Sequence, residues 1–162
     1  ALWAPQTFEA EKLGLKTIAH SSDCNARQPI LLVANMDYAN KHKGDIVAFL
    51  RVYLRSVDMM KKTPAEDLAD DYMRFYNAWT GKAMTREEAI RDIKDHPVYA
   101  LDQQLAMFKQ SYGTSELREW LHDIVSFQNE TGELDRRDLA RLERLHYVTD
   151  IYLKAVKEPA KK

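Results

Sequence analysis

The chain has 162 residues, enough for one domain with a substantial core, and its composition of 45% hydrophobic and 30% charged residues is typical of globular proteins. The net charge of −1 and the pI of 6.6 argue against nucleic-acid binding, which usually needs a strongly basic face, and no apolar run is as long as a membrane-spanning helix. Cys24 is the single cysteine, which excludes an internal disulfide and a cysteine-rich zinc site.

The first 36 residues alternate between strand-like and helix-like segments. The pattern predicts strands over 1–4, 16–19 and 30–36, and a short helix over 6–13 that Gly14 ends. A polar, turn-rich loop over 20–29 precedes the third strand. That strand, ILLVANM, is an unbroken apolar run of the kind found in sheets covered on both faces.

Beyond residue 36 the pattern is helical. Apolar residues recur at helical spacing over 45–60, and residues 63–66 (TPAE) and 85–88 (TREE) are typical of capping boxes. The first expected helix, 37–41, is capped by Asp37 and broken by Gly44, and the second is 45–60. A third helix, 64–79, ends at Gly81, and a fourth, 85–95, stops before Pro97. The remaining expected helices are 100–111, one that Thr114 or Ser115 caps and Gly132 ends, and 135–153.

The predicted fold class is therefore α/β, with a few strands near the N-terminus followed by a mainly helical remainder. Two or three strands cannot form a fully covered sheet alone, because the backbone groups of ILLVANM need strand neighbours. We therefore expect the chain to be the C-terminal portion of a longer protein. Its parts would be a strand and crossover part over 1–36, a helical part over 37–157 and a frayed tail over 158–162.

Three features resemble the periplasmic substrate-binding proteins of ABC transporters, in the branch for nitrate, sulfonate, taurine and thiamine-precursor uptake. The first is a strand ending in Trp3-x-Pro5, and the second is a strand, an Asp-containing turn and a long helix over 32–54. The third is the KTPAE link between helices at 62–66. The resemblance is clearest over residues 1–70.

This resemblance implies the C-terminal part of a type II periplasmic-binding-protein fold. The chain would be the solute-binding component of an ABC importer, binding a sulfonate, nitrate, taurine or pyrimidine-type ligand between two lobes and delivering it to a permease. It would be periplasmic or a membrane-anchored lipoprotein, and it would use no cofactor or metal and perform no catalysis. Two alternatives stay open: a fragment of a pyrimidine synthase of thiamine biosynthesis, which belongs to the same branch, and a helical interaction domain.

Five residues are candidates for ligand binding: Trp3, Gln6, Thr7, Asn25 and Arg27. A Trp at a strand's carboxyl end offers a stacking surface, although it could instead pack under the following helix. Polar side chains in a first helical turn suit an anion, although they also serve as ordinary caps. A loop Arg can hold an oxyanion bidentately or simply be solvated.

Other residues have simpler explanations. The five histidines show no metal-binding spacing, and no phosphate loop or Ser/His/Asp arrangement can be named. Trp79 and Trp120 occur at helical spacing, so we expect them in the core.

Overall fold

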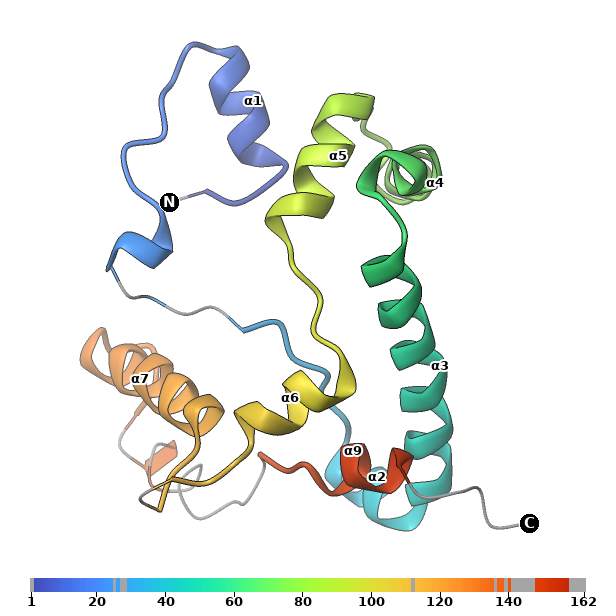
Figure 1. Cartoon of the computed structure of the whole chain (residues 1–162). Helices are drawn as coiled ribbons and strands as arrows, with labels where there is room; N and C mark the ends of the chain where they lie inside the picture. Colours follow the sequence, from blue (N-terminus) through green and yellow to red (C-terminus); the bar gives the residue numbers. More distant parts are fainter. Residues whose placement is uncertain are drawn as a thin grey trace. The chain divides into compact units, whose positions relative to one another are not determined.

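The computed structural model describes residues 2–24, 26, 29–111, 113–135, 137–138, 140 and 148–157 (Figure 1). Of these residues, 66% are helical and none lies in a β-strand; Ser111 and Thr114 form an isolated bridge. The predicted α/β fold class, with strands over 1–4, 16–19 and 30–36, is therefore wrong. The described part of the chain is all-α.

The three predicted strands fail for the same physical reason. Residues 30–34 are extended and exposed, with Ile30 and Val33 about nine-tenths accessible to solvent, and Ile18 is similarly open. Within the described residues, no backbone hydrogen bond joins 30–34 to another segment. A strand exists only when a neighbour completes its hydrogen-bond ladder. The apolar pattern correctly marked segments that are not helical, but apolarity alone does not provide that neighbour.

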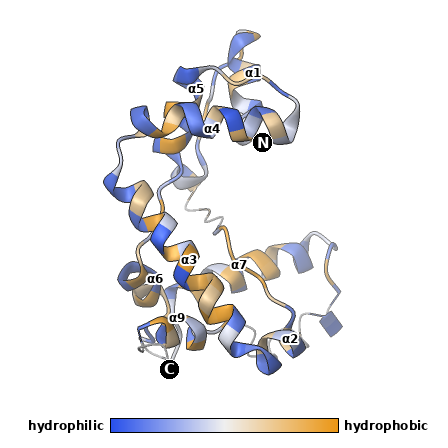
Figure 2. Ribbon diagram, turned by 90° about the vertical axis from the view of Figure 1, so that its right-hand side faces the viewer, coloured by the Kyte–Doolittle hydropathy of each residue, from blue (hydrophilic) through white to orange (hydrophobic). Residues whose placement is uncertain are grey.

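Contacts divide the chain into two units. The first unit comprises Ala1–Ala26 with Arg55–Tyr99, and the second comprises Arg27–Leu54 with Ala100–Lys162. Helix α3, Lys43–Lys62, contributes its first part to the second unit and its last part to the first. Figure 2 shows hydrophobic and hydrophilic residues alternating along this helix, as its amphipathic sequence requires.

The first unit is built on a helical hairpin. Its elements are α1 (Gln6–Lys12), the 3₁₀ helix η1 (Ser21–Cys24), α4 (Ala65–Thr80) and α5 (Arg86–Asp95). Ala69, Met84 and Ala89 form the buried centre between α4 and α5. Because alanines lie on both facing helices, their backbones can approach closely, and larger side chains fill the rim: Tyr72, Met73, Tyr76 and Ile90.

Besides the first part of α3, the helices described in the second unit are α2 (Met36–Lys41), α6 (Leu101–Met107), α7 (Glu116–Glu130) and α9 (Ile151–Val156). Residues of α6 and α9 pack on α3. Leu50 and Leu54 of α3 and Leu153 of α9 form its buried cluster. Leu101, Leu105 and other partly buried residues surround that cluster.

Three helix ends follow the predicted capping chemistry. Thr85 and Glu88 form a reciprocal capping box: the Glu88 amide donates to Thr85 Oγ1 at 3.2 Å, and the Thr85 amide donates to Glu88 Oε2 at 2.8 Å. Gly81 adopts a left-handed conformation with φ of 68°, which ends α4. Ser115 caps α7. These predictions are confirmed.

Other predicted ends are wrong. Thr63 does not cap α4: Pro64 occupies the N-cap position, and the Thr63 hydroxyl donates backward to the Met59 carbonyl at 2.8 Å. Gly44 does not break a helix but lies in the first turn of α3, where a glycine is tolerated. Asn35, rather than Asp37, caps α2.

The C-terminal helices are shorter than predicted. The helix expected over 100–111 stops at Met107. The one expected over 135–153 is interrupted, since residues 148–150 are not helical and α9 starts at Ile151. The expected positions Leu139, Leu142 and Leu145, and the tail over 158–162, lie outside the described residues. The division at residue 36 into functional parts stays a prediction.

Candidate ligand-binding site

Trp3 precedes the first turn of α1. Its carbonyl accepts a hydrogen bond from the Thr7 amide at 3.3 Å, while the Pro5 carbonyl accepts one from the Phe8 amide at 3.0 Å. No side chain caps this helix, so Thr7 does not have the capping role that was its alternative. The Trp3 side chain is 71% exposed and Gln6 is also exposed. The start of α1 therefore presents an aromatic ring and an amide to solvent.

The other two candidates are not located. Asn25 and Arg27 lie outside the described residues. The described residue between them, Ala26, donates its amide to the Ser21 carbonyl at 2.8 Å and so closes the end of η1. The structure therefore brings Trp3, Gln6 and Thr7 together on one short segment and leaves the roles of Asn25 and Arg27 as predictions.

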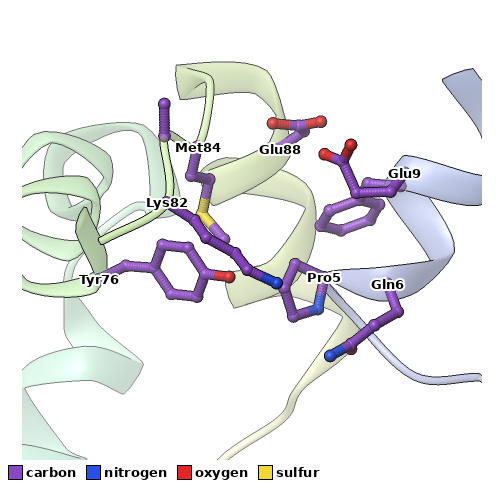
Figure 3. A pocket seen from close by; sticks show the side chains of 9 residues that line it. Pro5, Gln6, Glu9, Tyr76, Lys82, Met84 and Glu88 are labelled. Carbon is purple, nitrogen blue, oxygen red and sulfur yellow. The ribbon is translucent and has the colours of Figure 1, made fainter. Parts of the chain in front are cut away.

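A small pocket lies between α1 and the turn that joins α4 to α5 (Figure 3). Its lining residues are Pro5, Gln6, Phe8, Glu9, Tyr76, Lys82, Ala83, Met84 and Glu88. Figure 3 shows the Lys82 side chain extending past the Tyr76 ring toward Pro5. The cavity volume is about 30 Å³, room for about one or two water molecules. Small-molecule sites usually measure about 300–1,000 Å³, so this pocket alone does not enclose an organic ligand.

Ion pairs hold α1 on α5. Arg91 donates to both carboxylate oxygens of Glu11, at 2.6 and 3.1 Å, and its guanidinium lies 5.0 Å from the centre of the Phe8 ring. Lys12 pairs with Glu88 at 2.8 Å and with Glu9 of its own helix at 2.9 Å. Phe8 itself is buried. We call these contacts the α1 clamp: Phe8, Glu11 and Lys12 against Glu88 and Arg91.

The charges of the clamp perturb one another. Hydrogen bonding to Glu88, and then to Glu9, raises the pKa of Lys12 to about 12. Hydrogen bonding from Arg91 lowers the pKa of Glu11, and that from Lys12 lowers the pKa of Glu88. Each group is therefore held in its charged form by its partner. Sequence reasoning missed the clamp, because its partners lie far apart in the chain and each one separately looks like a solvated charge.

A second polar group ties α4 to the end of α5. Asp92 is buried, and the Tyr72 hydroxyl donates to its Oδ2. His96 Nδ1 lies 2.9 Å from the Asp92 backbone carbonyl and 3.2 Å from Asp92 Oδ1. Asp92 Oδ1 is buried and has no hydrogen-bond partner among the described residues. Burial, and then hydrogen bonding to Asp92, raises the pKa of Tyr72. The group locks the two helices together and keeps Tyr72 a hydrogen-bond donor.

The described residues contain no group of three or more His, Cys, Asp or Glu side chains placed to hold a metal ion. Among the helices that the structure describes, none is both long and apolar enough to cross a membrane.

In the comparisons with known proteins, no family model, curated protein or solved structure matches this chain.

Proposed function

We propose that this chain is the solute-binding component of an ABC importer. It would bind a small organic or anionic ligand of the sulfonate, nitrate, taurine or pyrimidine type and pass it to a permease. The observation that carries the proposal is the exposed Trp3 ring, which stands immediately before a docked helix. The KTPAE link between helices at 62–66, which resembles such proteins, adds to it.

The surroundings of Trp3 suit a binding role. An exposed aromatic ring contributes most when its position is fixed before the ligand arrives, because less conformational freedom is then lost on binding. The hydrogen bond from the Thr7 amide fixes the Trp3 backbone to α1, and the α1 clamp fixes α1 to α5. The ring is therefore supported from the first unit's core while its faces stay open for stacking. Gln6 adds an amide that can donate to an oxyanion.

The small size of the pocket bears on how a ligand would be held. A ligand site normally buries most of the ligand surface. A cavity of about 30 Å³ beside Gln6 cannot do so. In the proposed function the ligand is enclosed between the Trp3 surface and a second lobe, and closure of the two lobes around it is the working motion.

The test is calorimetric titration of the whole gene product with taurine, an alkyl sulfonate, nitrate and an aminopyrimidine. One of these ligands should bind, and Trp3→Ala should weaken it by about 1–3 kcal/mol, which is roughly five- to 150-fold. Phe127→Ala is the matched control, since Phe127 is a similarly exposed aromatic residue on α7, and it should leave the affinity unchanged. Unchanged affinity in Trp3→Ala, or no binding by any of the four ligands, would contradict the proposal.

A second candidate function is that of a helical interaction domain, and one observation favours it. Phe75 and Trp79 are exposed on α4 and pack edge-to-face, with ring centres 5.3 Å apart. Adjacent exposed aromatic residues on a soluble protein commonly mark an interaction site. If this is the main function, Trp79→Ala should abolish partner binding, whereas Trp3→Ala should not. Capture experiments with the two variants separate the candidates.

A further inference from the structure

The pocket beside α1 is lined by side-chain groups that can donate hydrogen bonds. They are the Gln6 amide, the Tyr76 hydroxyl and the Lys82 ammonium group (Figure 3). Among the described residues, no hydrogen bond or ion pair engages any of these three groups. Phe8 and Met84, which are buried, contribute apolar surface to the same pocket. The pocket therefore combines apolar surface with unused donors, which is the composition of a site for a small polar group.

The two acidic residues of the pocket are already engaged. Glu9 pairs with Lys12 at 2.9 Å. One oxygen of Glu88 pairs with Lys12 at 2.8 Å, and the other accepts a hydrogen bond from the Thr85 amide at 2.8 Å. Neither carboxylate forms an ion pair with Lys82, and Figure 3 shows both of them apart from its ammonium group. The formal charges of the two carboxylates and the two lysines cancel, so an anion would be held by short-range hydrogen bonds at Lys82 rather than by long-range attraction.

The backbone of Lys82 is fixed on both sides. Gly81 ends α4 just before it with φ of 68°, and the Lys82 amide donates to Thr80 Oγ1 at 3.2 Å. The Met84 amide donates to Asn77 Oδ1 at 3.0 Å, and the Met84 side chain is buried. The turn is therefore attached to α4 before and after Lys82. A donor that is already positioned loses less conformational freedom when a ligand binds.

The size of the cavity matches a charged group rather than a whole organic ligand. Its volume of about 30 Å³ has room for one or two atoms of the size of a water oxygen. The oxygens of a nitrate or a sulfonate are of that size, and the remainder of an organic ligand lies outside the cavity. Trp3, which precedes Pro5 on the same segment, offers an exposed ring to that remainder.

We propose that the ligand of this site is an oxyanion and that Lys82, Gln6 and Tyr76 hold its charged end. The carbon part of the ligand, where there is one, rests on Trp3. This inference rests on the proposed function and deepens it, because it favours nitrate, a sulfonate or taurine over a pyrimidine and adds Lys82 to the binding residues. Sequence reasoning missed Lys82, because a single lysine after a helix-ending glycine looks like a solvated charge.

Calorimetric titration of the whole gene product with nitrate, ethanesulfonate, taurine and an aminopyrimidine tests the inference. At least one of the three oxyanions should bind, and Lys82→Gln should weaken its affinity about tenfold or more. Lys82→Arg keeps the charge and the donors and should retain most of the affinity. Tyr76→Phe removes only a hydroxyl and should weaken binding about two- to tenfold. Lys16→Gln, at an exposed lysine of the same unit that does not line the pocket, is the matched control and should bind like the parent.

Three results would overturn this inference while leaving the proposed function standing. The first is binding of the aminopyrimidine alone, weakened by Trp3→Ala. The second is an oxyanion that binds Lys82→Gln as tightly as the parent. The third is an equal loss of affinity in Lys16→Gln, because the effect would then come from net charge. If none of the four ligands binds, the proposed function fails together with this inference.

Discussion

Truncation of Phe8 should release α1 from the first unit. Phe8 is only 4% exposed, and burying a phenylalanine side chain contributes about 1.5–3 kcal/mol. The Arg91 guanidinium over its ring adds about 0.5–1 kcal/mol, the lower end being appropriate because Arg91 is half-exposed. Phe8→Ala should therefore cost about 3 kcal/mol of docking free energy, which is roughly a 150-fold change in the docking equilibrium.

The helix itself makes this loss visible. A seven-residue helix is not stable alone in water, so α1 should unfold once it leaves α5. Hydrogen exchange followed by mass spectrometry should show faster exchange of the amides of 8–14 in Phe8→Ala, while the α4–α5 hairpin keeps its protection. Phe127→Ala serves as the control for loss of an exposed aromatic residue. Unchanged protection of 8–14 in Phe8→Ala would refute the view that burial of this ring holds α1 in place.

Two further predictions concern the same region. Thr85→Ala removes the hydroxyl that caps α5 and should lower the free energy of unfolding by about 0.5–2 kcal/mol, measured by chemical denaturation against the conservative Thr85→Ser. Docking of α1 should also depend on pH. The pKa values of Glu11 and Glu88 are lowered from 4.5, so their contribution is present above about pH 4.5 and is lost as the pH falls through their folded values. The pKa of Lys12 is raised to about 12, so its contribution is complete below about pH 10.5 and is lost as the pH rises through 12. After correction for its intrinsic pH dependence, the amide exchange of residues 8–14 should be faster at low pH and at high pH than near pH 7. Constant protection of these amides from pH 7 to pH 3 would contradict the predicted contribution of Glu11 and Glu88.

The long helices could be predicted because their signals are local. The apolar period over 45–60 and the capping box at 85–88 depend on residues within one or two turns of one another, and Gly81 ends its helix by its own backbone preference. The failure at Thr63 is also local. Its hydroxyl donates to the Met59 carbonyl of the preceding helix, and Pro64 occupies the N-cap position of α4.

The strands could not be predicted because a strand depends on something distant. ILLVANM has the composition of a buried strand, but no segment in the described residues completes its hydrogen-bond ladder. Trp79 shows the same limit for a helix: its spacing correctly placed it on the apolar face of α4. Whether that face is covered depends on which other segments pack against it, and no local pattern reveals that.

The candidate site was accessible to sequence reasoning only at the level of single residues. Trp3 was selected for its ring and its position before Pro5, and the structure places it in the open at the start of α1. The α1 clamp that supports this position joins Glu11 and Lys12 to Arg91 and Glu88, which are more than 70 residues away in the sequence. Such pairing becomes visible only in three dimensions.

Glu88 couples two residues of the first unit that do not contact each other, Thr85 and Lys12. One of its carboxylate oxygens accepts from the Thr85 amide and the other pairs with Lys12, so one side chain completes both the start of α5 and the attachment of α1. Fraying at Thr85 frees the carboxylate to swing away, and Lys12 then loses its partner. The effects of changes at Thr85 and Lys12 on unfolding free energy should therefore be non-additive, although the two residues are far apart in the sequence. A ligand that immobilised the segment around Trp3 would, through this carboxylate, disfavour fraying at the start of a helix that it never contacts.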